Sequence, residues 1–97
     1  MQQWPFDSPA TTACLAVRDV MAGTRPILEV HRDPDGDWQF LPGVEVSEAD
    51  AMVVSLAEVL QLDESLVAVA DLPPGYFALR ASETERWQRQ RSAANDE

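Results

Sequence analysis

One short stretch of the chain combines a turn, a strand and a second turn: Asp33-Pro34-Asp35-Gly36-Asp37-Trp38-Gln39-Phe40-Leu41-Pro42-Gly43. Pro34 presets φ for the second position of a turn, and Gly36 accepts a positive φ, so residues 33–36 are expected to form a tight turn. Trp38 and Phe40 are two residues apart and therefore share one face of the strand that follows. With an alternating strand at residues 27–32 before it, the stretch predicts a β-hairpin.

Three further strands are expected outside this hairpin. Apolar runs and alternation predict them at residues 11–18, 52–54 and 76–81. In the last of these, Phe77 and Leu79 should face away from Tyr76 and Ala78, and in the strand at 27–32 the expected core face carries Leu28, Val30 and Arg32.

Helix signals lie between and after the strands. Ser55 and Glu58 have the spacing of a capping box, and Asp63 is placed to cap a short turn after the first helix. Ser82 and Glu85 repeat the capping-box spacing, which predicts a C-terminal helix that docks through Trp87. The expected fold class is α+β: a mostly antiparallel sheet of four to five strands, with short helices packed on one face and a C-terminal helix.

The length of 97 residues predicts one domain. Residues 1–10 read as an N-terminal arm that Trp4 and Phe6 could pin to the domain, residues 11–91 as a single α+β domain, and residues 92–97 as a frayed acidic tail. Cys14 lies in an apolar run and is most simply a buried thiol. The first residues carry no secretory signal pattern, and no apolar run approaches the roughly 20 residues of a membrane helix, so we expect a cytoplasmic protein that does not bind membrane.

The net charge of −10 is concentrated in the middle of the chain. Residues 1–32 and 72–97 each sum to zero, whereas residues 33–71 hold ten acids and no base. The ten acids are Asp33, Asp35, Asp37, Glu45, Glu48, Asp50, Glu58, Asp63, Glu64 and Asp71. Such a surface repels nucleic acid and anionic membrane and steers toward a basic protein partner. The simpler alternative is that the acids serve solubility.

No metal or cofactor site is predicted. The aspartates at 33, 35 and 37 begin like a calcium loop, but the sixth position from Asp33 is Trp38 and the twelfth is Val44, where an EF-hand needs glycine and an acid. One Cys and one His, 17 residues apart, do not provide the four ligands of a structural zinc site.

No catalytic residues are predicted either. The chain has no Lys and its single His, His31, lies near a strand end beside Arg32 and Asp33. Nucleophilic catalysis needs an activated Ser or Cys with a base, and nothing indicates one. A pair of carboxylates acting as a hydrolase remains an alternative by residue type alone. We expect a protein that is not an enzyme.

The sequence allows two interpretations of Trp38. It is either a core residue or an aromatic anchor at an interface, since acids surround it in the sequence. The hypothesis for partner binding groups it with the neighbouring acids. The residues of that hypothesis are Asp35, Asp37, Trp38, Glu45, Glu48 and Asp50.

Several motifs together resemble a known family. They are Ala13-Cys14-Leu15-Ala16, Arg32, Gly36-Asp37-Trp38-Gln39-Phe40-Leu41-Pro42-Gly43-Val44-Glu45, Ser55-Leu56, Asp63, and Leu72-Pro73-Pro74-Gly75 followed by Phe77 and Arg80. In this order they resemble a small bacterial family first catalogued as a domain of unknown function and later assigned to the immunity proteins of polymorphic toxin systems. The resemblance spans roughly residues 12–80. It departs from the family pattern at Asp37, which separates Gly36 from Trp38.

The resemblance implies a non-catalytic protein-binding module that neutralises a cognate toxin. An adaptor or regulatory domain is the alternative, and a hydrolase of unrecognised type is the third.

Overall fold

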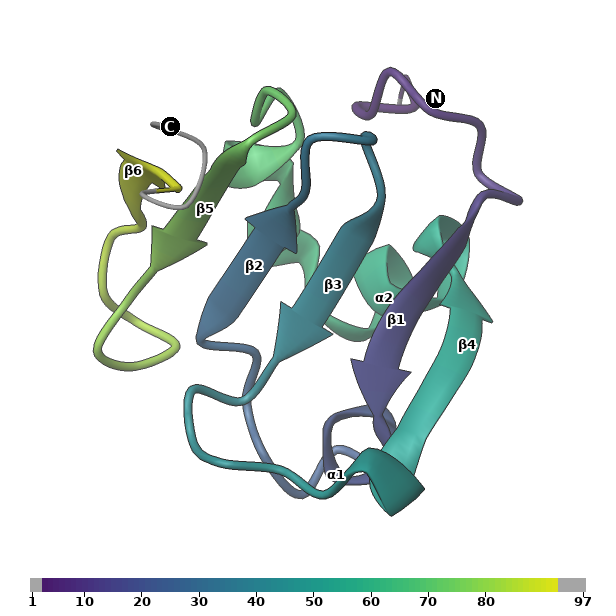
Figure 1. The fold of residues 1–97 in the computed structure, drawn as a ribbon, viewed down its shortest axis with the longest axis vertical. Helices are drawn as coiled ribbons and strands as arrows, with labels where there is room; N and C mark the ends of the chain where they lie inside the picture. Colours follow the sequence, from purple (N-terminus) through teal and green to yellow (C-terminus); the bar gives the residue numbers. More distant parts are fainter. Residues whose placement is uncertain (1–2, 93–97) are drawn as a thin grey trace.

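The structure is a computed structural model that describes residues 3–92. Six strands form one sheet in the spatial order β4-β1-β3-β2-β5-β6 (Figure 1). The strands are β1 (Ala13–Val17), β2 (Glu29–Arg32), β3 (Trp38–Leu41), β4 (Ala51–Ser55), β5 (Tyr76–Leu79) and β6 (Gln88–Arg91). Every neighbouring pair is antiparallel except β1 and β3, which run parallel. The α+β class and the mostly antiparallel sheet are thereby confirmed, with six strands in place of four or five.

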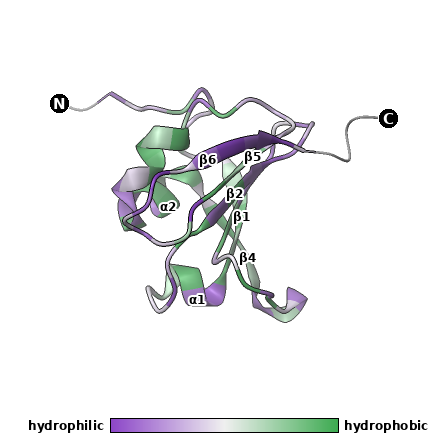
Figure 2. Cartoon of the chain, turned by 90° about the vertical axis from the view of Figure 1, so that its left-hand side faces the viewer, coloured by the Kyte–Doolittle hydropathy of each residue, from purple (hydrophilic) through white to green (hydrophobic). Residues whose placement is uncertain are grey.

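The helices are short. They are α1 (Arg18–Met21), the 3-10 helix η1 (Glu48–Asp50), α2 (Leu56–Leu62) and the 3-10 helix η2 (Glu64–Val69). Helices α2 and η2 lie on one side of the sheet (Figures 1 and 2). The capping box at Ser55 and Glu58 is present, and the carboxylate of Asp63 accepts from the amide of Ser65 to cap η2, as predicted.

The core fills the space between the sheet and these helices. Trp38, Phe40 and Val30 point to it from the central hairpin, and Leu56 and Leu66 meet them from the helices; each is at most 1% exposed. Phe6 from the N-terminal arm closes the core with its ring edge-on to Trp38, 5.2 Å between centroids. The prediction that Phe6 pins the arm is confirmed.

The turn in the opening stretch also forms as predicted. The amide of Gly36 donates to the carbonyl of Asp33 at 2.8 Å, and φ of Gly36 is +93°. The Asp33 carboxylate accepts from the amide of Asp37 at 3.0 Å, so this acid is used to hold the turn.

The predicted C-terminal helix is wrong. Residues 82–87 form turns, and the Ser82 hydroxyl contacts the Thr84 hydroxyl at 3.2 Å in place of a helix amide. Residues 88–91 form β6 against the free edge of β5, where Arg89 hydrogen-bonds to the carbonyl of Ala68 and the carboxylate of Asp71. A helix here would have had only Trp87 to bury, whereas the strand satisfies backbone groups of β5 and pairs Arg89 with an acid. The predicted tail at 92–97 lies outside the described residues from 93 onward.

Candidate interaction surface

The sheet has one covered face and one uncovered face. Side chains pointing to α2 and η2 are buried, and their neighbours along each strand are half-exposed, as the alternation in β2 (Glu29, Val30, His31, Arg32) illustrates. Within residues 3–92, no helix covers the second face, which is turned to the viewer in Figure 1. We call this second face the open face.

One row of the open face crosses all six strands. Strand pairing joins Val53 to Leu15, Leu15 to Gln39, Gln39 to His31, His31 to Phe77 and Phe77 to Gln90. A second, shorter row joins Glu29 to Leu79 and Leu79 to Gln88. Since directly paired residues lie on the same side of a sheet, these side chains form a continuous surface.

The open face is unusually apolar for a solvated sheet face. Such faces normally carry polar side chains. Here Leu15, Phe77 and Leu79 are half-exposed and Val53 is 74% exposed. Gln39 and His31 lie between the pair Leu15 and Val53 and the pair Phe77 and Leu79, so the face carries two exposed apolar patches. Exposed apolar patches are typical of interaction sites.

An aromatic pair lies near the middle of the open face. The His31 imidazole stacks on the Phe77 ring at 5.3 Å between centroids and 14° between planes. Its Nε2 lies 3.2 Å from Oε2 of Glu29. His31 is therefore held between the Phe77 ring and the Glu29 carboxylate on the open face.

Acids lie at both ends of the open face. Asp35 and Asp37 occupy the β2–β3 turn, at the end of the sheet where the N-terminal arm lies (Figure 1). Glu45, Glu48 and Asp50 occupy the β3–β4 connection at the opposite end. Asp50 pairs with Arg18 at 3.4 Å, whereas the other four carboxylates form no ion pair with any residue between 3 and 92.

The hypothesis that these acids form one site with Trp38 is corrected in two respects. Strand β3 separates the two acidic groups, so they flank the open face and do not cluster. Trp38 is 1% exposed and lies among Phe6, Phe40 and Arg32, whose guanidinium carbon is 4.7 Å from the indole centroid. Of its two readings the core one is correct, and no partner can touch this side chain.

Sequence reasoning missed the apolar residues of the open face as a possible site. The signal was present in the alternation of β5, which places Phe77 and Leu79 opposite the buried Ala78. Nothing in that pattern told whether a second layer would cover them, because coverage depends on the placement of the helices.

Other kinds of site receive no support. In the described part of the chain, no group of three or more His, Cys, Asp or Glu is arranged to hold a metal ion. No helix among residues 3–92 has the length and apolar character needed to cross a bilayer. Burial, and secondarily the charge of Glu58, raises the pKa of the Cys14 thiol to about 12, so this thiol is a poor nucleophile.

Comparison with protein-family models, with curated proteins and with solved structures finds no match to this chain.

Proposed function

We propose that this protein is a non-catalytic protein-binding module that uses the open face to bind a basic protein partner. The observation that carries the proposal is the presence of exposed apolar side chains on both sides of the middle of an uncovered sheet face, where Phe77 stacks on His31. Among residues 3–92, Glu29 is the only carboxylate in the paired rows of that face, and it is already engaged with His31.

The apolar and charged side chains of the open face are arranged as in a protein–protein interface. Interfaces combine an apolar, aromatic-rich centre depleted of charge with a polar rim. On the open face, Leu15, Phe77 and Leu79 supply the centre. Asp35 and Asp37 at one end, with Glu45 and Glu48 at the other, supply an acidic rim.

The acidic rim favours a partner with basic residues at its own rim. Opposite charges at the edge of an interface accelerate encounter and exclude partners of like charge. The net charge of −10 disfavours nucleic acid, whose phosphates are bound by basic surfaces.

The resemblance to immunity proteins gives the partner a more specific identity. An immunity protein masks a surface of its cognate toxin and needs no catalytic group of its own. We therefore propose that the partner is a bacterial toxin domain, neutralised in the cytoplasm by occlusion against the open face.

The test begins with the proteins encoded by the adjacent genes. Each is expressed in a host alone and together with this protein, and growth is measured. We expect one neighbour to arrest growth alone and to lose this effect on co-expression. If no neighbour is toxic, or co-expression relieves no toxicity, the immunity role is wrong.

The surface is then tested on the purified complex. Amide-exchange protection should fall on β1, β3, β2 and β5. The double variant Val53→Gln and Phe77→Gln should lose rescue while melting near the wild-type temperature. Leu62→Gln is the matched control, because Leu62 is an exposed apolar residue (42%) on α2, in the other layer. Protection confined to α2 and η2 would refute the open face as the binding surface.

A further inference from the structure

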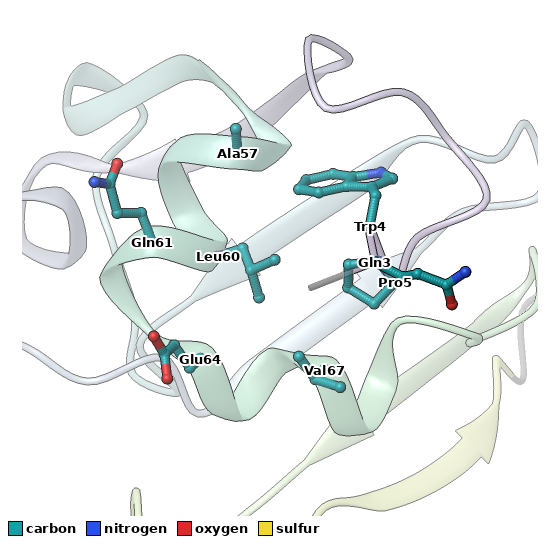
Figure 3. A pocket seen from close by; sticks show the side chains of 8 residues that line it. All are labelled: Gln3, Trp4, Pro5, Ala57, Leu60, Gln61, Glu64 and Val67. Atoms are coloured by element: carbon teal, nitrogen blue, oxygen red, sulfur yellow. The ribbon is translucent and has the colours of Figure 1, made fainter. Parts of the chain in front are cut away.

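A second binding feature lies in the other layer, between the N-terminal arm and the helices. The cavity there has a volume of about 610 Å³ and is bordered by Trp4 and Pro5 of the arm and by residues of α2 and η2 (Figure 3). We name it the arm pocket. It lies on the side of the sheet that the helices cover, so an inference about it does not depend on the open face.

The floor and one wall of the arm pocket are apolar. Leu60 of α2 and Val67 of η2 lie below the Trp4 ring in the view of Figure 3, and Ala57 lies to its left. Val67 is 53% exposed and Trp4 36%, which is high for large apolar side chains. The pocket therefore keeps apolar surface in contact with water, and an apolar ligand group would remove it from water.

The Trp4 ring is fixed in place. Its Nε1 donates to the carbonyl of Ser8 at 2.6 Å, and its ring centroid lies 5.4 Å from that of Phe6, which is itself inserted in the core. An indole that is already oriented loses little conformational freedom when a ligand packs on it.

Among residues 3–92, the only charged side chain that borders the arm pocket is negative. It belongs to Glu64, at the start of η2, which forms no ion pair within residues 3–92. Gln3 and Gln61 supply the other polar groups at the rim. Nearby Glu58 and Asp63 are engaged, by the capping box and by Arg80 respectively.

We infer that the arm pocket binds an Arg or Lys side chain of a protein partner, next to an apolar residue of the same segment. The apolar neighbour and the aliphatic stem would pack on Leu60, Val67 and the Trp4 ring, and the cation would extend to the Glu64 carboxylate, which lies across Leu60 from Trp4 in Figure 3. Long basic side chains bury their stems on apolar surface while the charged head stays at a polar rim. A cation with this stem is the ligand that satisfies an aromatic ring, an apolar floor and one carboxylate together.

The test uses short blocked peptides as probes, so it does not require the natural partner. The probe is acetyl-Leu-Arg-amide, compared with the Lys, Gln and Glu analogues, titrated into ¹⁵N-labelled protein. The Trp4 indole N–H resonance, assigned from a Trp4→Phe variant, is the reporter. We expect saturable shifts of this resonance and of the Leu60 and Val67 amides with the Arg and Lys probes. The Gln probe should bind about two- to fivefold more weakly, as expected for loss of an exposed ion pair with Glu64, and the Glu probe should be weaker still.

Variants separate charge from shape. Glu64→Gln should weaken the Arg probe severalfold and leave the Gln probe unchanged, whereas Glu48→Gln, a matched loss of one exposed charge on the β3–β4 connection, should change neither. Trp4→Leu should weaken both cationic probes. Equal affinity for the Arg and Gln probes would mean an apolar cleft without cation selectivity and would overturn the inference. Shifts that map to the open face, or no saturable shift with any probe, would also overturn it, and neither result would bear on the toxin test above.

Discussion

The Arg80 guanidinium donates from Nη2 to Oδ2 of Asp63 at 2.7 Å, and 1% of the Arg80 side chain is exposed. The same guanidinium donates to the carbonyl of Ile27 from Nε and Nη2, and to the hydroxyl of Ser65 from Nη1. Its carbon lies 4.1 Å from the centroid of the Trp87 ring. One side chain therefore ties the end of β5 to the start of β2, to the cap of η2 and to the segment that leads into β6.

Replacement of Arg80 by Met should destabilise the fold strongly. The change removes the partner of a carboxylate that is 23% exposed and leaves the Ile27 carbonyl without a donor. Removing one member of a buried ion pair typically costs about 3–5 kcal/mol, and we expect about 3 kcal/mol here because Asp63 retains some solvent. Urea unfolding measures the loss. Arg80→Lys should not restore stability, since an ammonium lacks the planar fork of donors.

The matched variant is Asp63→Asn, which removes the charge and keeps a side-chain oxygen for the Ser65 amide. It should lose less than Arg80→Met. A larger loss for Asp63→Asn, or an unchanged unfolding midpoint for Arg80→Met, would contradict the central role of the guanidinium.

Local sequence signals predicted the structure correctly where a segment forms its hydrogen bonds within a few residues of the chain. The Asp33 to Gly36 turn and the Ser55–Glu58 capping box each satisfy their own backbone groups within a few residues, so the sequence indicated them correctly. Ser82 and Glu85 have the same spacing, but the helix they predicted does not form. Contacts with distant parts of the chain decide the structure of this segment. The free edge of β5 and the Asp71 carboxylate offer residues 88–91 more than an isolated helix does.

The candidate site was less predictable than the fold. Charge partition along the chain identified the acids, but their arrangement at opposite ends of β3 required the topology. The apolar residues of the open face were visible only as strand alternation. Arg80 is a further case, because a buried arginine near the end of a strand has no local sequence signature when its partners are 15 and 17 residues away.

The two serine substitutions Ser55→Ala and Ser82→Ala should differ in their effect. Ser55 accepts from the Glu58 amide and its own amide donates to the Glu58 carboxylate, so Ser55→Ala should cost about 1 kcal/mol. Ser82 caps no helix, and its replacement should fall within about 0.5 kcal/mol of wild type. Thermal unfolding of both variants is the measurement. Equal losses would indicate that residues 82–87 are held more tightly than the structure describes.

The pKa of Asp71 should report on the docking of β6. The hydrogen bond from Arg89 is the main cause that holds the pKa of Asp71 below its ordinary value of 3.8. A carboxyl whose pKa is lowered on folding stabilises the fold above its unfolded pKa, and this contribution is lost as pH falls through the folded value. NMR titration of Arg89→Gln should return the pKa of Asp71 toward 3.8. If the pKa of Asp71 stayed low in this variant, its backbone hydrogen bond, and not Arg89 of β6, would be the cause of the shift.

The thiol of Cys14 should be unreactive in the folded protein. Its pKa is raised from 9.0 to about 12, mainly by burial and to a smaller extent by the charge of Glu58. At about pH 8 the native protein should not react with a disulfide reagent over a time in which the urea-unfolded protein reacts completely. Because the folded pKa is the higher one, the contribution of Cys14 to stability should be constant below about pH 9 and should fall as pH rises toward 12. Rapid labelling of the native protein would show that the core around Cys14 opens.

The final prediction separates the acidic rim of the open face from net charge. Three double variants each remove two negative charges: Asp35→Asn with Asp37→Asn at one end, Glu45→Gln with Glu48→Gln at the other, and Glu83→Gln with Glu85→Gln in the segment before β6, away from the middle of the open face. All six side chains are exposed, so the three proteins should unfold with the stability of the wild type. With the partner identified by growth rescue, stopped-flow association should slow for both rim variants and change little for the third.

The salt concentration is the second variable in the same experiment. Steering acts over a Debye length of about 10 Å at 0.1 M salt and about 3 Å at 1 M, so the rate differences should be largest at low salt and should vanish at high salt. Dissociation rates should change less than association rates, because rim charges act mainly before contact while Leu15, Phe77 and Leu79 hold the complex. If all three variants slow association equally, the partner senses only total charge. If none does, the acids serve solubility, and the apolar row of the open face must account for recognition alone.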